Sequence, residues 1–281
     1  MEILHSKEDL KQRVRQYQQQ KKVIGFVPTM GALHEGHLSL VECSRKQDDV
    51  TVVSIFVNPT QFNRRDDYEK YPRDLDRDLN DLEQAGVGIV FAPTEQEMYP
   101  EPDHRTFDFA QLDRVMEGKY RPGHFNGVAR IVTKLFDVVM PHRAYFGEKD
   151  FQQLAIIRHV NRQMDYPIEI VGCPIIRESD GLAKSSRNAR LTRGQRQEAA
   201  AISGALFEAA AQAERLTVEQ LREQVISRLN KYPQIDVEYF EIVDEQTLQP
   251  ISHKDEARDK RACIAAWVGQ VRLIDNVKIY C

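Results

Sequence analysis

Two histidines stand three residues apart in the stretch FVPTMGALHEGHLSL, which covers residues 26–40. The apolar run 23–27 predicts a short buried strand, and a helical pattern of apolar residues begins at Leu38. His34 and His37 therefore fall where a strand passes into a helix. The first N–H groups of a helix have no partner within it, so imidazoles and backbone N–H groups can bind an anion together at such a position.

Two other interpretations of the histidine pair are open. The side chains could simply cap the helix or lie in a loop, which is the more common situation for an isolated pair. They could also bind a metal ion, although HEGH is one residue shorter than H-E-x-x-H and no further ligand stands nearby. Anion binding accounts for one more feature, because Gly31 and Gly36 would let a phosphate approach the backbone closely.

A second polar stretch, FVNPTQFN at residues 56–63, follows the apolar run TVVSIFV at residues 51–57. That run predicts a strand buried on both faces. An ordinary Asn-Pro turn explains Asn58, but it does not explain Gln61, whose amide can both donate and accept hydrogen bonds. We expect Asn58 and Gln61 at the same edge of the sheet as His34.

Three further stretches carry glycines, cations or hydroxyls. GKYRPGHFNGV at 118–128 ends a segment that is expected to be irregular between residues 100 and 127. YFGEKDFQQL at 145–154 places Lys149 at a strand-to-helix junction. GLAKSSRN at 181–188 could be a solvated loop, or a mobile loop that closes over a polyphosphate. Surface salt bridges and loops explain each stretch separately, so only their convergence would indicate a site.

The order of the elements predicts an α/β protein. Up to about residue 176, buried apolar runs alternate with helical patterns, which indicates a Rossmann-like parallel sheet. Beyond it come two helical segments, 193–213 and 217–230, and then three strand-like runs. We therefore expect a Rossmann-like domain over 1–176 and a smaller α+β domain over 177–281. Three of these stretches are expected to fall where the first three strand-to-helix edges of the sheet would converge. In an open parallel sheet the carboxyl ends of the strands are also where ligands bind.

Composition narrows the class of protein. The 281 residues are 41% hydrophobic and 29% charged, which is typical of a soluble globular chain. A net charge of −4 gives no general attraction to nucleic acid or to an anionic membrane. The four cysteines form no C-x-x-C pair, so we expect reduced thiols without a zinc site. A signal peptide and a bilayer-spanning run are not evident, so a cytoplasmic location is expected.

Five stretches, taken in order, resemble the pantothenate synthetase family: PTMGALHEGH, FVNPTQF, RPGHFNGV, FGEKDFQQL and GLAKSSRN. The resemblance extends to RLIDN near the C-terminus and so covers essentially the whole chain. It implies an ATP-dependent ligase that joins (R)-pantoate to β-alanine through a pantoyl-adenylate and releases AMP and pyrophosphate. It also implies a Rossmann-like domain with a smaller C-terminal lid, use of Mg²⁺ and a homodimer.

The same resemblance implies roles for individual residues. The catalytic groups would be cations and hydroxyls that face the phosphates, namely His34, His37, Lys149, Ser185, Ser186 and Arg187. The ATP-binding residues would be Met30, Gly31, Ala32, Leu33, His34, Glu35, Gly36, His37, Gly147, Glu148, Lys149, Asp150, Ile176, Lys184, Ser185, Ser186 and Arg187. The substrate-binding residues would be Gln61, Gln153 and Asn58. Lys184 replaces the Met or Leu of many members, and Arg130 replaces an apolar residue or Thr; neither is given a role. The ligands of a metal ion are not specified either.

Other classes share some of these features. A nucleotidyltransferase of the same H-x-G-H superfamily would have the HEGH loop but should lack the pair Gln61 and Gln153. A non-catalytic nucleotide-binding protein would be expected to have lost some of the cations, and none is missing from this sequence. A metallohydrolase would need a bound metal ion.

Overall fold

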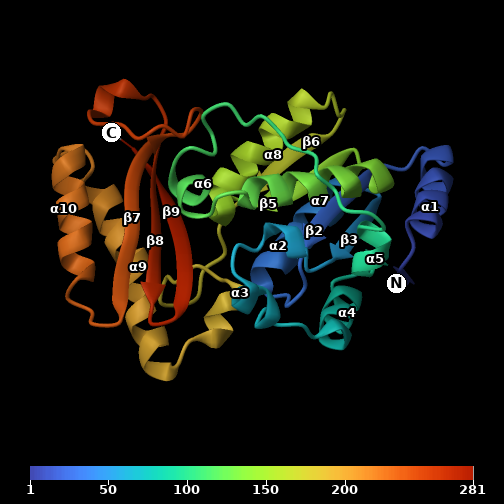
Figure 1. Ribbon diagram of the computed structural model, residues 1–281, viewed down its shortest axis with the longest axis horizontal. Helices are drawn as coiled ribbons and strands as arrows, with labels where there is room; N and C mark the ends of the chain where they lie inside the picture. Colours follow the sequence, from blue (N-terminus) through green and yellow to red (C-terminus); the bar gives the residue numbers. More distant parts are fainter. Residues whose placement is uncertain (281) are drawn as a thin grey trace. The chain divides into compact units, whose positions relative to one another are not determined.

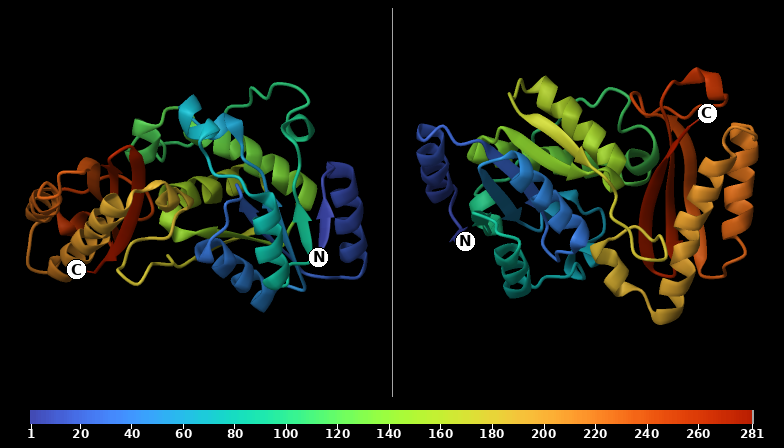
Figure 2. Two further views of the ribbon diagram at one scale, coloured as in Figure 1. Left: turned by 90° about the horizontal axis from the view of Figure 1, so that it is seen from below. Right: turned by 180° about the vertical axis from the view of Figure 1, so that it is seen from behind.

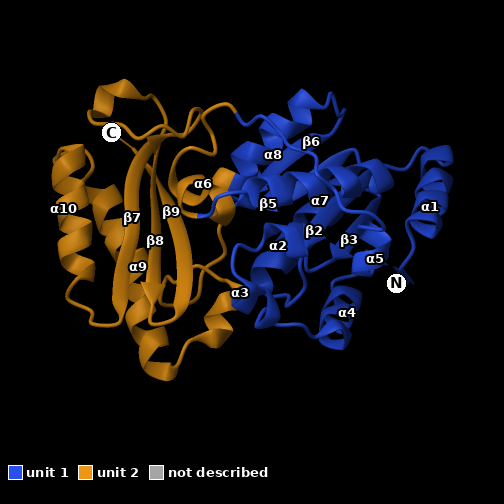
Figure 3. Cartoon of the chain, viewed as in Figure 1, with its two compact units in different colours: residues 1–109, 121–148, 153–174 blue, residues 110–120, 149–152, 175–281 orange. Residues whose placement is uncertain are grey.

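The computed structural model describes residues 1–280 and divides into two compact units (Figures 1 and 3). Unit 1 comprises residues 1–109, 121–148 and 153–174. Unit 2 comprises residues 110–120, 149–152 and the described residues from 175 onward. The assignment of domains to 1–176 and 177–281 stays a prediction, and each unit is described by itself below.

Unit 1 is built on a six-stranded parallel sheet in the order β1-β4-β3-β2-β5-β6. The strands are β1 (Glu2–Leu4), β2 (Ile24–Thr29), β3 (Val50–Ile55), β4 (Ile89–Phe91), β5 (Arg143–Gly147) and β6 (Glu169–Cys173). The predicted Rossmann-like sheet is confirmed. Strand β1 is only three residues long, too short to give a periodic signal in the sequence.

Helices connect these strands. They are α1 (Lys7–Gln19), α2 (Glu35–Gln47), α3 (Arg65–Glu69), α4 (Leu75–Gln84), α5 (Glu95–Met98), α7 (His124–Val139), α8 (Phe151–Gln163) and the single 3₁₀ turns η1 (Pro59–Gln61) and η2 (Glu148–Asp150). The expectation of an irregular chain up to Gly127 is wrong, since α7 begins at His124 and α6 (Met116–Tyr120) precedes it in unit 2. Helix α7 starts after Gly123 without a side-chain cap, so the usual start signal is missing from its sequence.

Helices cover both faces of the sheet (Figure 2). On one face Phe26 belongs to an apolar cluster with residues of α1, α7 and α8, and on the other Val27 packs with residues of α2 and α4. Successive strand residues point to opposite faces, so a strand covered on both sides must be apolar throughout. This explains why the strands appear in the sequence as unbroken apolar runs.

Unit 2 holds a three-stranded antiparallel sheet in the order β7-β8-β9. Its strands and helices are β7 (Ile235–Asp244), β8 (Lys260–Val268), β9 (Val271–Ile279), α9 (Arg193–Gln212), α10 (Val218–Leu229) and the 3₁₀ turns η3 (Ser186–Arg190) and η4 (Lys254–Glu256). Thr192 and Thr217 cap α9 and α10, and an apolar cluster that includes Leu206 and Ile264 joins the helices to the sheet. The predicted α+β arrangement is confirmed.

The described residues include three of the four cysteines. Cys43, Cys173 and Cys263 are free thiols, and Cys281 lies outside the described residues. None of the helices formed by residues 1–280 is long and apolar enough to cross a membrane.

Candidate active site

Three polar segments follow three neighbouring strands of unit 1. The Met30–His37 loop follows β2, Asn58 follows β3, and Glu148 follows β5. Strand β2 pairs with β3 on one side and with β5 on the other, all in parallel, so their carboxyl ends lie at one edge of the sheet. The order of strands reverses between β2 and β5, which is where ligands bind in doubly wound sheets.

Both histidines cap helix α2, which begins three residues earlier than the apolar pattern indicates, at Glu35. His34 is the N-cap residue, and its Nδ1 accepts the N–H of Gly36 at 3.1 Å. Nδ1 of His37 accepts the N–H of His34 at 3.3 Å, and the two ring centroids are 4.1 Å apart. The capping interpretation is therefore correct, and it is compatible with anion binding. A ring nitrogen that accepts an N–H carries no proton, so each neutral imidazole has its proton on Nε2 and can donate there.

A buried carboxylate from α4 binds the loop residues that directly precede His34. Asp78 is 2% exposed and accepts the N–H groups of Ala32 at 2.8 Å and Leu33 at 2.7 Å. Gly31 and Ala32 both have positive φ, 76° and 49°, which turns these N–H groups toward the carboxylate. A Cβ on Gly31 would lie 2.8 Å from Oδ2 of Asp78, so glycine is required here whether or not a phosphate binds.

Asp78 is not among the site residues expected from the sequence, although its position in α4 carries a signal. It lies three residues after Leu75 and four before Leu82, on the apolar side of α4. An acid at a core-facing position needs a partner, and the loop N–H groups supply it. Burial raises the pKa of Asp78, while the hydrogen bonds from Leu33 and Ala32 act in the opposite direction.

Asn58 and Gln61 form a hydrogen-bonded pair that is almost fully buried, with exposed fractions of 1% and 9%. Nδ2 of Asn58 lies 3.1 Å from Oε1 of Gln61, and Nε2 of Gln61 lies 3.0 Å from the sulfur of Met30. Helix α7 supports the pair from behind. Nδ1 of His124 lies 2.8 Å from the Gln61 carbonyl oxygen, and Gly127 approaches so closely that a Cβ there would lie 2.2 Å from the Thr60 carbonyl oxygen.

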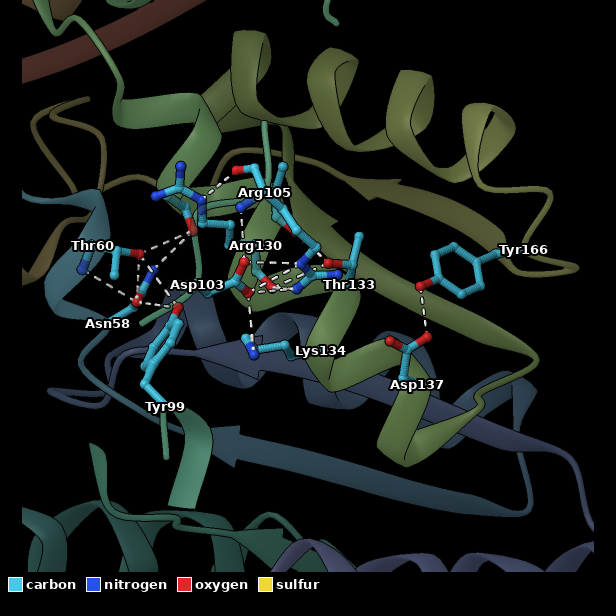
Figure 4. A network of polar contacts seen from close by, with 12 residues as sticks. Asn58, Thr60, Tyr99, Asp103, Arg105, Arg130, Thr133, Lys134, Asp137 and Tyr166 are labelled. Carbon is cyan, nitrogen blue, oxygen red and sulfur yellow. Dashed lines mark hydrogen bonds and ion pairs between the residues drawn. The ribbon is translucent and has the colours of Figure 1, made fainter. Parts of the chain in front are cut away.

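An ionic network braces the chain next to this pair (Figure 4). The Asp103 carboxylate contacts Arg105 at 2.8 Å and Lys134 at 3.2 Å, and hydrogen bonds from Arg105 hold the pKa of that carboxyl well below its usual range. Nε of Arg130 donates to the Arg105 carbonyl oxygen at 2.6 Å. The structure thus gives Arg130 a structural contact, in which it fastens the segment after Pro100 to α7.

In unit 2, a hydrogen bond from β9 fixes the backbone of Lys149. Its carbonyl oxygen accepts a hydrogen bond from Nδ2 of Asn276 at 2.9 Å, and its Nζ lies 3.8 Å from the Asp150 carboxylate. Asp275, beside Asn276, binds the guanidinium of Arg177 with both oxygens, at 2.7 and 2.9 Å. The RLIDN segment of β9 therefore anchors the backbone of Lys149 and the start of the chain that leads to the 184–187 loop.

The 184–187 loop is ordered by short-range contacts. Ser185 accepts the N–H of Arg187 at 3.3 Å and so begins η3. Lys184 donates its backbone N–H to the Ile176 carbonyl oxygen at 2.9 Å, and its Nζ lies 3.2 Å from the Glu178 carboxylate. The additional charge of Lys184 therefore has an ion-pair partner, Glu178, six residues earlier in the chain.

Two adjacent glutamines have different surroundings. Gln152 is buried in unit 2, where it donates to the carbonyl oxygens of Leu112 and Val115 and accepts the N–H of Glu117. These contacts make Gln152 a structural residue. Gln153, which was predicted to bind substrate, is partly exposed.

Across residues 1–280, no group of three or more His, Cys, Asp or Glu side chains is arranged to hold a metal ion. The metal-site interpretation of His34 and His37 therefore has no support from the described residues. Mg²⁺ usually keeps several waters and binds through substrate phosphates, so this donor set fits only an ion that is carried by a nucleotide.

A doubly wound parallel sheet with an H-x-G-H loop at its switch point defines a nucleotide-binding α/β protein. The family model described as pantoate-beta-alanine ligase matches residues 2–278, so the chain belongs to that family and is a ligase. The expected family is thereby confirmed.

Named relatives agree along the whole chain. The chain is 54% identical over 278 residues to a pantothenate synthetase of Bacteroides thetaiotaomicron, with 99% of each chain covered. It is 48% identical over 283 residues to one of Thermotoga neapolitana, covering 98% of this chain and 99% of that one.

Solved structures agree as well. Pantothenate synthetase from Thermus thermophilus has a TM-score of 0.94 and 41% identity, with both chains fully covered (100%). A pantoate-beta-alanine ligase from Francisella tularensis, complexed with beta-gamma ATP and beta-alanine, has a TM-score of 0.83 and 34% identity. The alignment with it covers 99% of this chain and 97% of that one.

Proposed function

We propose that the chain condenses (R)-pantoate with β-alanine through a bound pantoyl-adenylate and releases pantothenate, AMP and pyrophosphate. The observation that carries this proposal is the pairing of two features at one edge of the sheet in unit 1. After β2 stands a helix start whose capping imidazoles can donate from Nε2, and after β3 stands the buried amide pair Asn58 and Gln61. The first suits phosphate oxygens, and the second suits the oxygens of a small hydroxy acid.

In the first step, a pantoate carboxylate oxygen attacks the α-phosphorus of ATP and pyrophosphate leaves. Both reactants are anionic, so the protein must hold them in line and stabilise the charge that develops on the phosphoryl oxygens. His34 and His37 donate from Nε2, and the N-terminus of α2 adds its partial positive charge. The further groups assigned to this step are Lys149, Ser185, Ser186 and Arg187. No covalent bond to the protein is required.

In the second step, the neutral amine of β-alanine attacks the acyl carbon, the carbon–oxygen bond to phosphate breaks, and AMP leaves. The nitrogen loses one proton to solvent as the amide forms. The amides of Gln61 and Gln153 bind the oxygens of pantoate, and Pro28, Met30, Phe62 and Val128 can enclose its two methyl groups. A mixed anhydride hydrolyses when water enters, so closure of the 181–188 loop would protect it.

ATP binding is assigned to Met30–His37, Gly147–Asp150, Ile176 and Lys184–Arg187. Mg²⁺ would arrive with the phosphates of ATP and help to neutralise them, and no step is assigned to it here. A homodimer, a cytoplasmic location and a lid role for residues 177–281 are part of the proposal on the strength of the family resemblance.

The experiment that tests this function is a reaction of the purified protein with ATP, pantoate and β-alanine, in which pantothenate and AMP are quantified. All three substrates should be needed for pantothenate, whereas ATP and pantoate alone should yield pyrophosphate. A protein that forms a new pyrophosphate bond on a phosphorylated acceptor, and no amide, would be a nucleotidyltransferase instead. A protein that binds ATP without forming either product would be non-catalytic.

A further inference from the structure

The hydroxyl of Tyr99 lies beside Asn58 of the amide pair in unit 1 (Figure 4). Tyr99, at the end of α5, donates its hydroxyl to Oδ1 of Asn58 at 2.8 Å. Its partly buried ring lies 6.2 Å from that of Phe56, and Nζ of Lys134 lies 5.2 Å from its centroid. Burial raises the pKa of Tyr99, so the phenol keeps its proton at neutral pH and acts as a donor.

Backbone groups determine which way the Asn58 amide faces. Nδ2 lies 3.1 Å from the Gly127 carbonyl oxygen, which can only accept. On the other side, Oδ1 lies 3.4 Å from the backbone N–H of Thr60, which can only donate, and 3.0 Å from the Thr60 hydroxyl. A flipped amide would therefore place two acceptors against each other and two donors against each other.

The orientation of Gln61 follows from that of Asn58. The second hydrogen of Nδ2 of Asn58 is directed to Oε1 of Gln61 at 3.1 Å, so Nε2 of Gln61 faces the other way, toward the sulfur of Met30 at 3.0 Å. A thioether is a weak acceptor, so an oxygen of a bound acid would replace it readily. Gln61 could donate or accept as a residue type, but in this structure it is presented as a donor.

We propose that Tyr99 is a positioning residue for the acid substrate. Its hydroxyl donates a short hydrogen bond to Oδ1 of Asn58 and so reinforces the orientation, set by the backbone groups, that makes Gln61 present an N–H group. Gln61 thereby selects a carboxylate or hydroxyl oxygen. This inference deepens the proposed function and rests on it, since it takes pantoate as the acid that meets Gln61. Tyr99 itself does not touch the substrate.

The reason that the hydroxyl matters is the burial of Asn58. With 1% exposure, Oδ1 has no access to water, and its remaining donors are the Thr60 hydroxyl and a long contact to the Thr60 N–H. Removing the tyrosine hydroxyl leaves a buried acceptor under-satisfied and loosens the amide pair. The loss should appear in the use of the acid and not in the use of ATP.

The test is Tyr99→Phe, which keeps the ring and removes one oxygen. Its matched control is Tyr166→Phe, which removes a hydroxyl that donates to Asp137 at 2.7 Å in the same unit. We expect Tyr99→Phe to lower kcat/KM for pantoate about tenfold, mainly through KM, and to leave KM for ATP within about twofold. Tyr166→Phe should change neither constant.

A double-mutant cycle separates positioning from a general structural role. If Tyr99 acts through Gln61, adding Tyr99→Phe to Gln61→Ala should change pantoate use by less than about twofold. An unchanged pantoate KM in Tyr99→Phe, equal losses for ATP and pantoate, or a tenfold loss that persists in the Gln61→Ala background would each overturn the inference.

The affinity of the wild-type protein and of Tyr99→Phe for pantoate can be measured by calorimetry. This measurement tests the role of Tyr99 without depending on the formation of pantothenate. A wild-type protein that binds pantoate about ten times more tightly than the variant supports the inference, even if no pantothenate is formed. Equal binding contradicts it. Absence of pantoate binding to the wild-type protein overturns both the inference and the proposed function.

Discussion

His34 and His37 show how one pair of side chains can have a structural and a chemical role together. Their Nδ1 atoms accept backbone N–H groups at the start of α2, which is the ordinary work of a cap. The same hydrogen bonds fix the neutral tautomer, so each Nε2 carries a proton that can be donated to a phosphate oxygen. Capping thus prepares the histidines for the chemistry proposed for them.

His37→Ala and Lys149→Ala should each slow adenylate formation by about 100-fold or more, because one donor to developing charge typically contributes about 2.7–4 kcal/mol. The measurement is the single-turnover release of pyrophosphate from ATP and pantoate. His104→Ala, at an exposed position between α5 and α6, serves as the control and should react at the wild-type rate. Near wild-type rates in both active-site variants would end the assignment of these two residues.

At the scale of elements, helix α4 positions the turn between β2 and α2, to which the proposal assigns ATP binding. Asp78 joins the buried side of α4 to the two N–H groups of the turn between β2 and α2. The turn contains two consecutive residues with positive φ, and a non-glycine residue such as Ala32 adopts that conformation only when its surroundings hold it. We therefore expect the shape of the loop to depend on a residue that does not contact ATP.

Asp78→Asn should lower kcat/KM for ATP by roughly 10- to 100-fold, since hydrogen bonds to a charged acceptor each contribute about 1.5–3 kcal/mol. The amide that replaces the carboxylate offers one acceptor to two N–H donors and places an NH₂ group against the other. Asp76→Asn makes the same change two residues earlier on the exposed side of α4 and should be neutral. Steady-state kinetics with ATP as the varied substrate decide the matter, and equal constants in the two variants would show that Asp78 does not hold the loop.

The sequence was sufficient for the sheet and for its edge, because strands covered on both faces are apolar throughout and their polar segments follow directly. The sequence was not sufficient to predict Asp78 and Tyr99, which support the candidate site residues without being among them. Asp78 lies 46 residues from Ala32, and Tyr99 lies 41 residues from Asn58. Contacts between residues so far apart in the chain produce no periodic pattern in the sequence. The start of α7 was missed for a local reason, because Gly123 precedes the helix without a capping side chain.

At the scale of the whole molecule, a chain with a net charge of −4 must bring two anions to reaction. The net charge does not attract anions, so individual hydrogen-bond donors and cations at the site must bind them. The residues proposed for this role are the capped histidines and the amide pair in unit 1, and Lys149 and the 184–187 loop in unit 2. The proposal draws on residues of both units, and the family model likewise matches residues 2–278 and is not confined to the sheet.

The most direct measurement follows the carboxylate oxygens of pantoate through the reaction. Pantoate labelled with ¹⁸O in its carboxylate is converted with ATP and β-alanine, and the products are analysed by mass spectrometry. Because the attacking oxygen remains on phosphorus when the amide forms, one labelled oxygen should appear in AMP and none in pyrophosphate. Label in inorganic phosphate together with ADP, or pantothenate formed without label in AMP, would contradict carboxylate adenylation at this site.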